Sequence, residues 1–486
     1  MLAQFNYLST VSGGGYVGSW LSAWLKRAHD AGPDGWPKVW ASLAGPRPDP
    51  DEEPAQITWL RTYSNYLTPQ LGLTSADTWA AIAIFLRNLI LNWFVLVPVL
   101  AAVLLALKVV AIALVWISVL DPQRDLQRTI FCKLVILGVL GLLVALYFSN
   151  WQRPTHGPSR AVESTFLKWD LLPGCLAALL LTCALAAPQA EIFAKKYLIA
   201  GSRPSLLALA VLGAAGSAVC ALSWIGAWLQ QPKKLLADFV SWVIGGFIFG
   251  TLVGLGIYLY FSSPPAGFWP FTTKEILLLT VGVPWGIVSG LVVEMIFIGL
   301  TRDMPGSDTD REWLGRAAGW YLTIAIAWPV AMTLVFVGSI LANHFYGELS
   351  TWITAGGAGT ITALLGKSSV TPAKNGTATW TILSFNVILA IAAIVFAVAL
   401  IVGLSALLDH ILFGKPLVEA LPHTVVIGKL PGWPGGIWVP IALGLVLFLG
   451  FVASWRVNIN RFSLHALYRN RLIRGFLGAS NLNRER

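Results

Sequence analysis

Nine apolar runs constrain what this sequence can fold into more than any other feature. Each run holds about 17 to 30 residues, and a helix of about twenty apolar residues can cross the hydrocarbon core of a bilayer. Hydrophobic residues make up 56% of the 486 positions and charged residues 12%, which is not the composition of a soluble domain. The expected fold class is therefore mainly α, a polytopic membrane bundle. The runs cover residues 89–119, 130–148, 171–187, 205–229, 239–261, 276–300, 318–341, 382–408 and 437–454.

The number of spans is expected to be eight to ten. Residues 351–366 are glycine-rich and less apolar than the nine runs, so they form a tenth span, a re-entrant segment or an external loop. Basic residues gather before the first run and after the last, and such residues favour the cytoplasmic side of a membrane. If both termini lie there, the count is even. The basic residues are Lys26, Arg27, Lys38, Arg61 and Arg87 at one end and Arg456, Arg461, Arg469, Arg471 and Arg474 at the other.

Composition also excludes several function classes. The formal net charge is +10, but the sequence has no soluble basic domain to hold a duplex, so no nucleic-acid partner is expected. An anionic lipid surface suits the basic termini better. The cysteines and four of the histidines lack the spacing of metal ligands, so neither a metal nor an organic cofactor is expected. These residues are Cys132, Cys175, Cys183, Cys220, His344, His410, His423 and His465.

Two features inside the runs stand out. Glu294 lies in an apolar run, where a carboxylate marks either a functional site or a structural acid that reaches the interface near Arg302. Two neighbouring runs repeat glycine at every fourth position, at 246, 250 and 254 and at 282, 286 and 290. This spacing predicts that the backbones of those two helices approach each other closely.

The N-terminal stretch "YLSTVSGGGYVGSWL", residues 7–21, allows three interpretations. Gly13, Gly15 and Gly18 fit the G-x-G-x-x-G spacing of a dinucleotide site, with Asp34 at a tolerable distance, but a proline-rich stretch follows instead of a second strand. A glycine-rich helix start capped by a serine is the second interpretation. The third is a nucleophile elbow, with a strand over 3–11, a tight turn at Ser12 and a helix over 16–29.

The elbow interpretation assigns a chemical role to each part of the turn. A serine at such a turn has an exposed hydroxyl that can attack an acyl carbonyl. The Gly13 N–H would then donate to the oxyanion, and the helix N-terminus adds positive potential at the same place. Ser12 as nucleophile and Gly13 as oxyanion donor are the catalytic residues that we expect.

The same stretch resembles the nucleophile elbow of patatin-like phospholipases, particularly the large bacterial members with a multi-spanning membrane region. Two later stretches look like segments of those proteins: "SDTDREWLGRAAGW" at 307–320 and "FSLHALYRNRLIRGFLGAS" at 462–480. The resemblance implies an α/β hydrolase domain that hydrolyses acyl esters of membrane lipids with a Ser-Asp dyad. It also implies a bacterial inner-membrane protein with both termini in the cytoplasm, for which membrane lipids are substrate and solvent.

This sequence lacks the motif that carries the partner aspartate in that family. That Asp-Gly-Gly or Asp-Gly-Ala motif is absent from this sequence, and Asp34-Gly35 is followed by Trp36 and lies too close to Ser12. We therefore expect a fragment of the catalytic domain, cut at both ends and nearly inert alone, because an unactivated serine is a weak nucleophile. A transporter or channel-like protein with an incidental glycine turn is the alternative.

The expected organisation has four parts. Residues 1–30 form the partial catalytic segment, and residues 31–88 a linker with an interfacial helix. The linker holds six prolines between 33 and 54, which predicts a surface loop there. Residues 89–455 form the membrane region, in which the charged stretch 308–312 is expected to be a connecting loop. Residues 456–486 form a basic amphipathic segment that lies at the interface or returns to the soluble domain.

Overall fold

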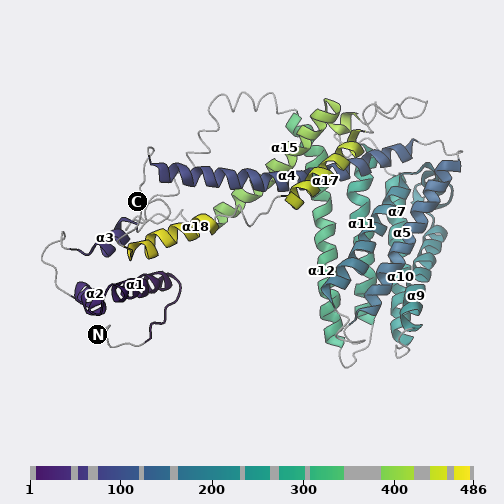
Figure 1. Cartoon of the computed structure of the whole chain (residues 1–486). Coiled ribbons are helices and arrows are strands. Elements are labelled where there is room, and N and C mark those ends of the chain that lie inside the picture. The colour runs from purple at the N-terminus through teal and green to yellow at the C-terminus, as the bar shows by residue number, and fades with distance from the viewer. Residues whose placement is uncertain are drawn as a thin grey trace, which may run out of the picture. The chain divides into compact units, whose positions relative to one another are not determined.

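The computed structural model is mainly α-helical (Figure 1). It divides into two compact units, a terminal unit of Met1–Val99 with Val446–Arg486 and a membrane unit of Leu100–Leu445. The structure describes residues 7–44, 53–63, 75–119, 125–153, 162–229, 236–262, 273–300, 307–343, 385–420, 438–456 and 465–481.

Nine helices among these residues are long and apolar enough to cross a membrane. They coincide with the nine apolar runs of the sequence, so the prediction of a multi-pass α-helical membrane protein is confirmed at this level. The preference for an even count stays a prediction, because residues 351–366 lie outside the described residues. The nine candidate spans are Thr78–Ser118, Asp125–Trp151, Glu163–Leu185, Leu206–Leu229, Asp238–Ser262, Lys274–Leu300, Asp308–Asn343, Ala390–Ala420 and Trp438–Arg456.

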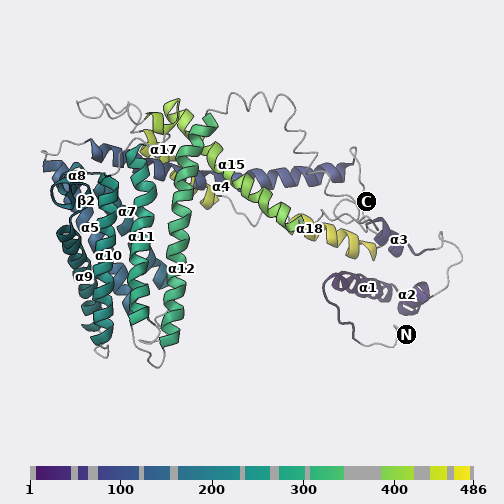
Figure 2. The same cartoon turned by 180° about the vertical axis from the view of Figure 1, so that it is seen from behind.

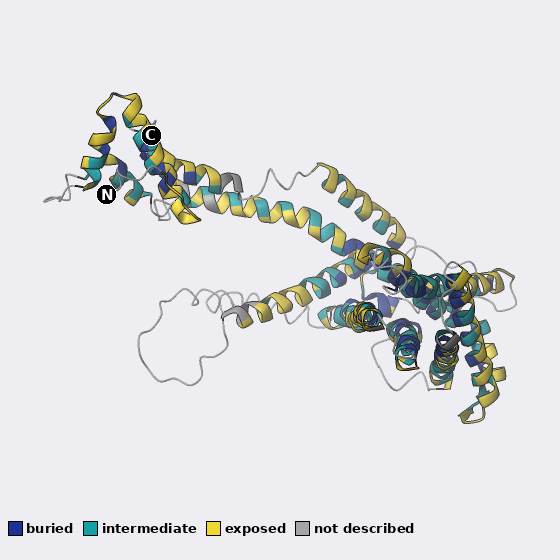
Figure 3. Cartoon of the chain, turned by 90° about the horizontal axis from the view of Figure 1, so that it is seen from below, coloured by how far each residue is buried: buried dark blue, intermediate teal, exposed yellow. Residues whose placement is uncertain are grey.

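The membrane unit packs its long helices side by side, as both views show (Figures 1 and 2). Their inner faces meet in a core that includes Leu114, Leu279 and Phe336. Large apolar side chains cover the outer faces as well, among them Leu140 and Phe396, each more than half exposed (Figure 3). Exposed apolar surface on this scale is what a lipid environment requires. The helices that lie side by side are α5 (Asp125–Trp151), α7 (Leu172–Leu185), α9 (Leu206–Leu229), α10 (Leu236–Ser262), α11 (Lys274–Leu300) and α12 (Ser307–Met332). The helix α15 (Phe385–Phe413) also belongs to this unit but runs obliquely to them (Figures 1 and 2).

The glycine repeats mark close helix packing, but with partners other than those expected. Gly246 and Gly250 of α10 lie directly against the backbone of α9, at Gly216 and Leu212. Gly282 and Gly286 of α11 instead face α7. The two helices do pack closely against each other, as expected, since a Cβ at Gly245 of α10 would lie 3.1 Å from the Val293 Cα of α11. The glycines of the repeats themselves make other contacts, because the spacing gives a helix a flat face without specifying its neighbour.

Two π-helical turns interrupt the membrane helices near polar side chains. The turn η5 (Leu167–Leu171) follows α6 (Glu163–Phe166), leads into α7 and carries Asp170. The turn η7 (Thr333–Val337) follows α12 and precedes Ser339. Between the spans, α8 (Pro188–Phe193) and η6 (Ala194–Leu198) lead into a two-stranded antiparallel hairpin, β1 (Ile199–Ala200) and β2 (Arg203–Pro204). Because π turns often occur at functional sites, Asp170 and Ser339 become site candidates.

The terminal unit joins both ends of the chain. Its helices α1 (Gly13–Asp30), α2 (Gly35–Ala44) and α3 (Ala55–Thr62) pack with α18 (His465–Leu472) and η10 (Ile473–Leu477) around Trp20 and Trp24. The Trp59 Nε1–H donates to the Arg474 carbonyl at 3.2 Å, and Arg27 donates to the Leu477 carbonyl at 3.1 Å. The basic C-terminal segment therefore returns to the N-terminal helices, one of the two alternatives that the sequence left open.

Four local expectations are corrected. Residues 7–11, the described part of the expected strand, have no regular secondary structure, because no described strand lies beside them to complete a sheet. The proline-rich stretch contains α2, whose Pro37 lies in the first turn, where a proline is tolerated. The helix α4 (Ala76–Ser118) runs from the expected interfacial segment into the first span without a break. The stretch 308–312 is the first turn of α12, with Asp308 and Arg311 paired at 3.6 Å.

Candidate functional site

Ser12 sits at a strained turn at the start of α1. Its φ and ψ are 53° and −126°, and it is the one non-glycine residue with positive φ in the part of the chain that the structure describes. Such a conformation costs about 1 to 3 kcal/mol, and strain of this kind gathers at active sites. The residue is exposed. The Ser12 hydroxyl is therefore exposed at a turn whose backbone conformation is unfavourable for serine.

The glycines allow the segment before Ser12 to fold back along α1. A Cβ at Gly18 would lie 2.8 Å from Thr10 Cγ2, so Gly18 is needed for this close approach. The Gly14 N–H donates to the Val11 carbonyl at 3.1 Å and the Gly15 N–H to the Ser12 carbonyl at 2.9 Å. The Gly13 N–H takes no part in these turn bonds. This glycine spacing serves packing of the preceding segment against the helix.

The other interpretations of the turn fit less well. Ser12 occupies the N-cap position, but its side chain makes no capping hydrogen bond. Asp34 lies beyond the far end of α1, which is 18 residues or about 27 Å long, so Asp34 cannot act as a base for Ser12. No described residue hydrogen-bonds to the Ser12 hydroxyl. The turn thus presents an exposed hydroxyl with no base beside it among the described residues.

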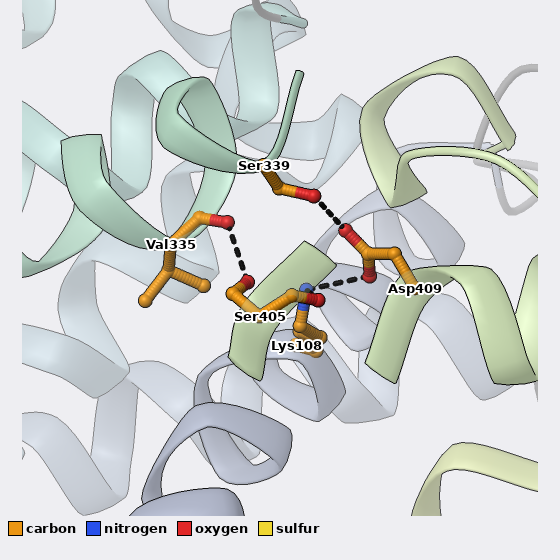
Figure 4. Close-up of polar contacts among 5 residues, drawn as sticks. All are labelled: Lys108, Val335, Ser339, Ser405 and Asp409. Carbon is orange, nitrogen blue, oxygen red and sulfur yellow. Dashed lines mark hydrogen bonds and ion pairs between the residues drawn. The ribbon is translucent and has the colours of Figure 1, made fainter. Parts of the chain in front are cut away.

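A second polar site lies inside the membrane unit, where Lys108 of α4 meets Asp409 of α15 (Figure 4). The Lys108 Nζ donates to Asp409 Oδ1 at 2.5 Å, and the Ser339 hydroxyl donates to Asp409 Oδ2 at 2.5 Å. Lys108 is 0% exposed and Asp409 2%. The Ser405 hydroxyl donates to the Val335 carbonyl at 2.8 Å, beside the π-helical turn η7. Charges at this depth are costly and mark either a structural pairing or a transport path.

A third site is a cavity of about 870 Å³ between α5, α7, α10 and α11. Its wall is mostly apolar and includes the glycine face of α11 at Gly282, Gly286 and Gly290. Polar side chains line it at two separate levels. Ser149, Asp170, Glu294 and Tyr321 form one group, and Glu191, Lys195 and Lys274 form the other.

The two acids of the first group, Asp170 and Glu294, are held differently. Asp170 accepts a hydrogen bond from the Tyr321 hydroxyl at 2.7 Å, whereas Glu294 Oε1 accepts a long one from Ser149 at 3.4 Å. Glu294 Oε2 has no hydrogen-bond partner among the described residues, although Glu294 is only 8% exposed. The two carboxyls interact electrostatically. Glu294 thus lines the cavity and has one buried carboxyl oxygen without a hydrogen-bond partner among the described residues.

Arg153 lies near the acids but does not line the cavity. Its guanidinium stacks on Phe297 at 3.8 Å from the ring centre and donates to Asn150 Oδ1 at 2.6 Å. It interacts electrostatically with Asp238 and Asp310 before Glu294, so its charge is shared among three carboxylates. Arg153 therefore does not serve the acidic level of the cavity alone.

The other polar level is basic. Lys195 pairs with Glu191 at 2.6 Å on an exposed helical turn. The Lys195 ammonium, which donates to Glu191, holds the pKa of that carboxyl below its ordinary value, so Glu191 stays ionised near neutral pH. Lys274 adds a positive charge to this level, where the Lys195–Glu191 pair is neutral overall. One level of the cavity is thus lined by Asp170 and Glu294, and the other by two lysines and Glu191, with Glu275 close to the lining residue Tyr260.

The sequence singled out Ser12, Gly13 and Glu294 but missed the groups that Lys108 and Asp170 belong to. A signal was present, since Lys108 is a charge inside an apolar run and Asp170 directly precedes another. The Lys108–Asp409 pair is separated by 301 positions, so only the fold brings it together. Arg302 lies outside the described residues, and Glu294 lines the same cavity as Asp170.

Comparison of the chain with protein-family models, with curated proteins and with solved structures gives no match.

Proposed function

We propose that this protein is a membrane-bound serine lipid acyl hydrolase of the patatin-like kind, with Ser12 as the nucleophile. The observation that carries the proposal is the positive φ of the exposed Ser12 directly before helix α1. Nucleophile elbows have this strained turn from an extended segment into a helix. Residues 7–11 are not helical. The Ser12 hydroxyl is exposed, as attack on an ester requires.

The surroundings of Ser12 fit the second requirement of acyl transfer, stabilisation of the oxyanion. The Gly13 N–H lies at the first turn of an 18-residue helix, where the partial positive charge of the helix end favours an anion. Removal of one oxyanion donor in a serine hydrolase lowers the rate by about 10²- to 10³-fold, so the Gly13 N–H is expected to raise the rate of acyl transfer. No metal or organic cofactor is needed for this chemistry.

The terminal unit supports a catalytic domain interrupted by a membrane region. Helices from both ends of the chain share one core around Trp20 and Trp24, while the candidate spans lie between them in the sequence. In this proposal the spans hold the active site beside its substrate, the membrane lipids. The location is the bacterial inner membrane, with the terminal unit in the cytoplasm. The base is an aspartate of the Asp-Gly-Gly or Asp-Gly-Ala motif, which this chain lacks.

A fluorophosphonate probe tests the proposal, with the protein expressed from its own genomic locus. We expect the probe to label Ser12, and Ser12→Ala to abolish the label, because this probe forms a covalent bond only with an activated serine. Ser19→Ala is the matched control, since Ser19 is an exposed serine on the same helix whose hydroxyl donates to the Gly15 carbonyl. Labelling that survives Ser12→Ala would exclude Ser12 as the nucleophile.

The DNA on both sides of the reading frame gives an independent check. An in-frame glycine-rich loop upstream and an Asp-Gly-Gly or Asp-Gly-Ala motif downstream would support the hydrolase. Their absence would favour the second candidate function, transport across the membrane. The buried Lys108–Asp409 pair and the polar groups of the cavity favour that candidate, because ionisable side chains inside membranes line transport paths.

A further inference from the structure

We propose that the cavity of the membrane unit binds a single-chain amphiphilic amine, with its ammonium group at Glu294 and Asp170 and its alkyl chain along α11. This binding site is independent of Ser12, which belongs to the terminal unit. The proposal depends on three properties of the cavity: its shape, its charge and the unpartnered oxygen of Glu294.

The shape fits one extended alkyl chain. Lys274 and Glu294 both line the cavity and lie 20 residues apart on α11, which corresponds to about 30 Å along the helix axis. A volume of about 870 Å³ spread over this length leaves a mean cross-section of about 30 Å². The space beside α11 is open at Gly290, because no other atom lies within 4 Å of the position of a Cβ added there.

The charge at the acidic level selects a cation. Two carboxyls, Asp170 and Glu294, line this level, and the nearest buried cation, Arg153, is shared with Asp238 and Asp310. An ammonium group has three donors and no acceptor, so it can satisfy Glu294 Oε2, which has no partner among the described residues. Tyr321 already donates to Asp170 Oδ1, which keeps that carboxyl turned toward the cavity.

The basic level fixes the orientation of the ligand. Lys195 and Lys274 lie at the opposite level from the acids, so an ammonium group is repelled there and attracted at Glu294. A fatty acid would take the reverse orientation and leave Glu294 unsatisfied beside its terminal methyl group. A neutral alcohol would donate an uncharged hydroxyl to the carboxylate, and this hydrogen bond is weaker than the one that a charged ammonium group donates. An amine therefore fits the whole cavity better than either alternative.

The test uses the purified full chain and a twelve-carbon primary amine that carries a diazirine in its alkyl chain. On irradiation we expect cross-links to residues of the cavity wall, such as Leu181, Val253 and Trp285. Dodecylamine is expected to compete at a concentration at least tenfold lower than dodecanol or dodecanoate, because only the amine makes charge-assisted bonds with the carboxyls. Equal competition by dodecanol, or stronger competition by dodecanoate, would overturn the proposal.

Two pairs of variants locate the site. Glu294→Gln is expected to weaken the apparent affinity for the amine about tenfold or more, whereas Glu312→Gln, which neutralises an exposed acid on α12, should not change it. Gly290→Phe fills the cavity and should abolish cross-linking, whereas Gly299→Phe adds the same ring at an exposed position of α11 outside the cavity. Retention of wild-type cross-linking in Glu294→Gln or Gly290→Phe would overturn the proposal. The competition series on the unchanged protein stays decisive if a variant does not fold.

Discussion

Substitution of Lys108 by methionine, with Asp409 left in place, is expected to lower the free energy of unfolding by about 3 to 5 kcal/mol. The reason is that the Asp409 carboxylate, 2% exposed, would lose the cation at 2.5 Å and keep only the Ser339 hydroxyl. Removal of one partner of a buried ion pair leaves an uncompensated charge, and no water is available inside the bundle to solvate it. Unfolding of the purified protein in mixed micelles, followed as the SDS fraction rises, measures the loss.

The double substitution Lys108→Met with Asp409→Leu separates charge from packing. We expect it to recover most of the stability, since an apolar pair of similar volume often replaces a buried ion pair without loss. The surface pair Lys195–Glu191 provides the control, because both partners are partly exposed. Lys195→Met should change the free energy of unfolding by no more than about 0.5 kcal/mol. A Lys108→Met protein as stable as the double variant would show that the pair contributes nothing to the fold.

The membrane helices could be predicted from the sequence because the physical requirement acts on each segment separately. A helix that crosses a bilayer needs about twenty apolar residues whatever its neighbours are, so each run identifies its own span. The nine candidate spans follow directly from this rule. The even count, in contrast, depends on charge balance and on residues 351–366, which a rule for single segments cannot decide.

Contacts between segments could not be predicted in the same way. Lys108 and Asp409 are 301 positions apart, and either charge alone is compatible with many partners. The glycine repeat at 246, 250 and 254 correctly indicated close packing but did not distinguish α9 from α11. Pairing is a property of the whole fold, and a single sequence holds no direct record of it.

The turn at Ser12 could be predicted only in part. Its sharpness could be predicted, because small residues around a serine at a helix start allow a conformation that most sequences avoid. The expected strand before it is not formed over residues 7–11. A strand needs neighbouring strands for its hydrogen bonds, and the described residues of the terminal unit are helical or lie in turns.

Substitution of Gly250 by alanine is expected to destabilise the membrane unit by about 3 kcal/mol, the upper end of the usual cost of overpacking. A Cβ at this position would overlap the carbonyl oxygen of Leu212 in α9. The obstacle is backbone, so no side chain can rotate away, and α9 and α10 must move apart along their whole contact. The same micelle unfolding measurement applies.

Three glycines with different surroundings predict an order of effects. Gly254→Ala should cost less than Gly250→Ala, because its Cβ would meet only the side chains of Leu209 and Leu212, at 2.8 Å or more, and these can shift. Gly290→Ala should be close to neutral or slightly stabilising, since nothing lies within 4 Å and alanine favours a helix over glycine. If Gly250→Ala and Gly290→Ala had equal stability, α9 and α10 would not be in backbone contact.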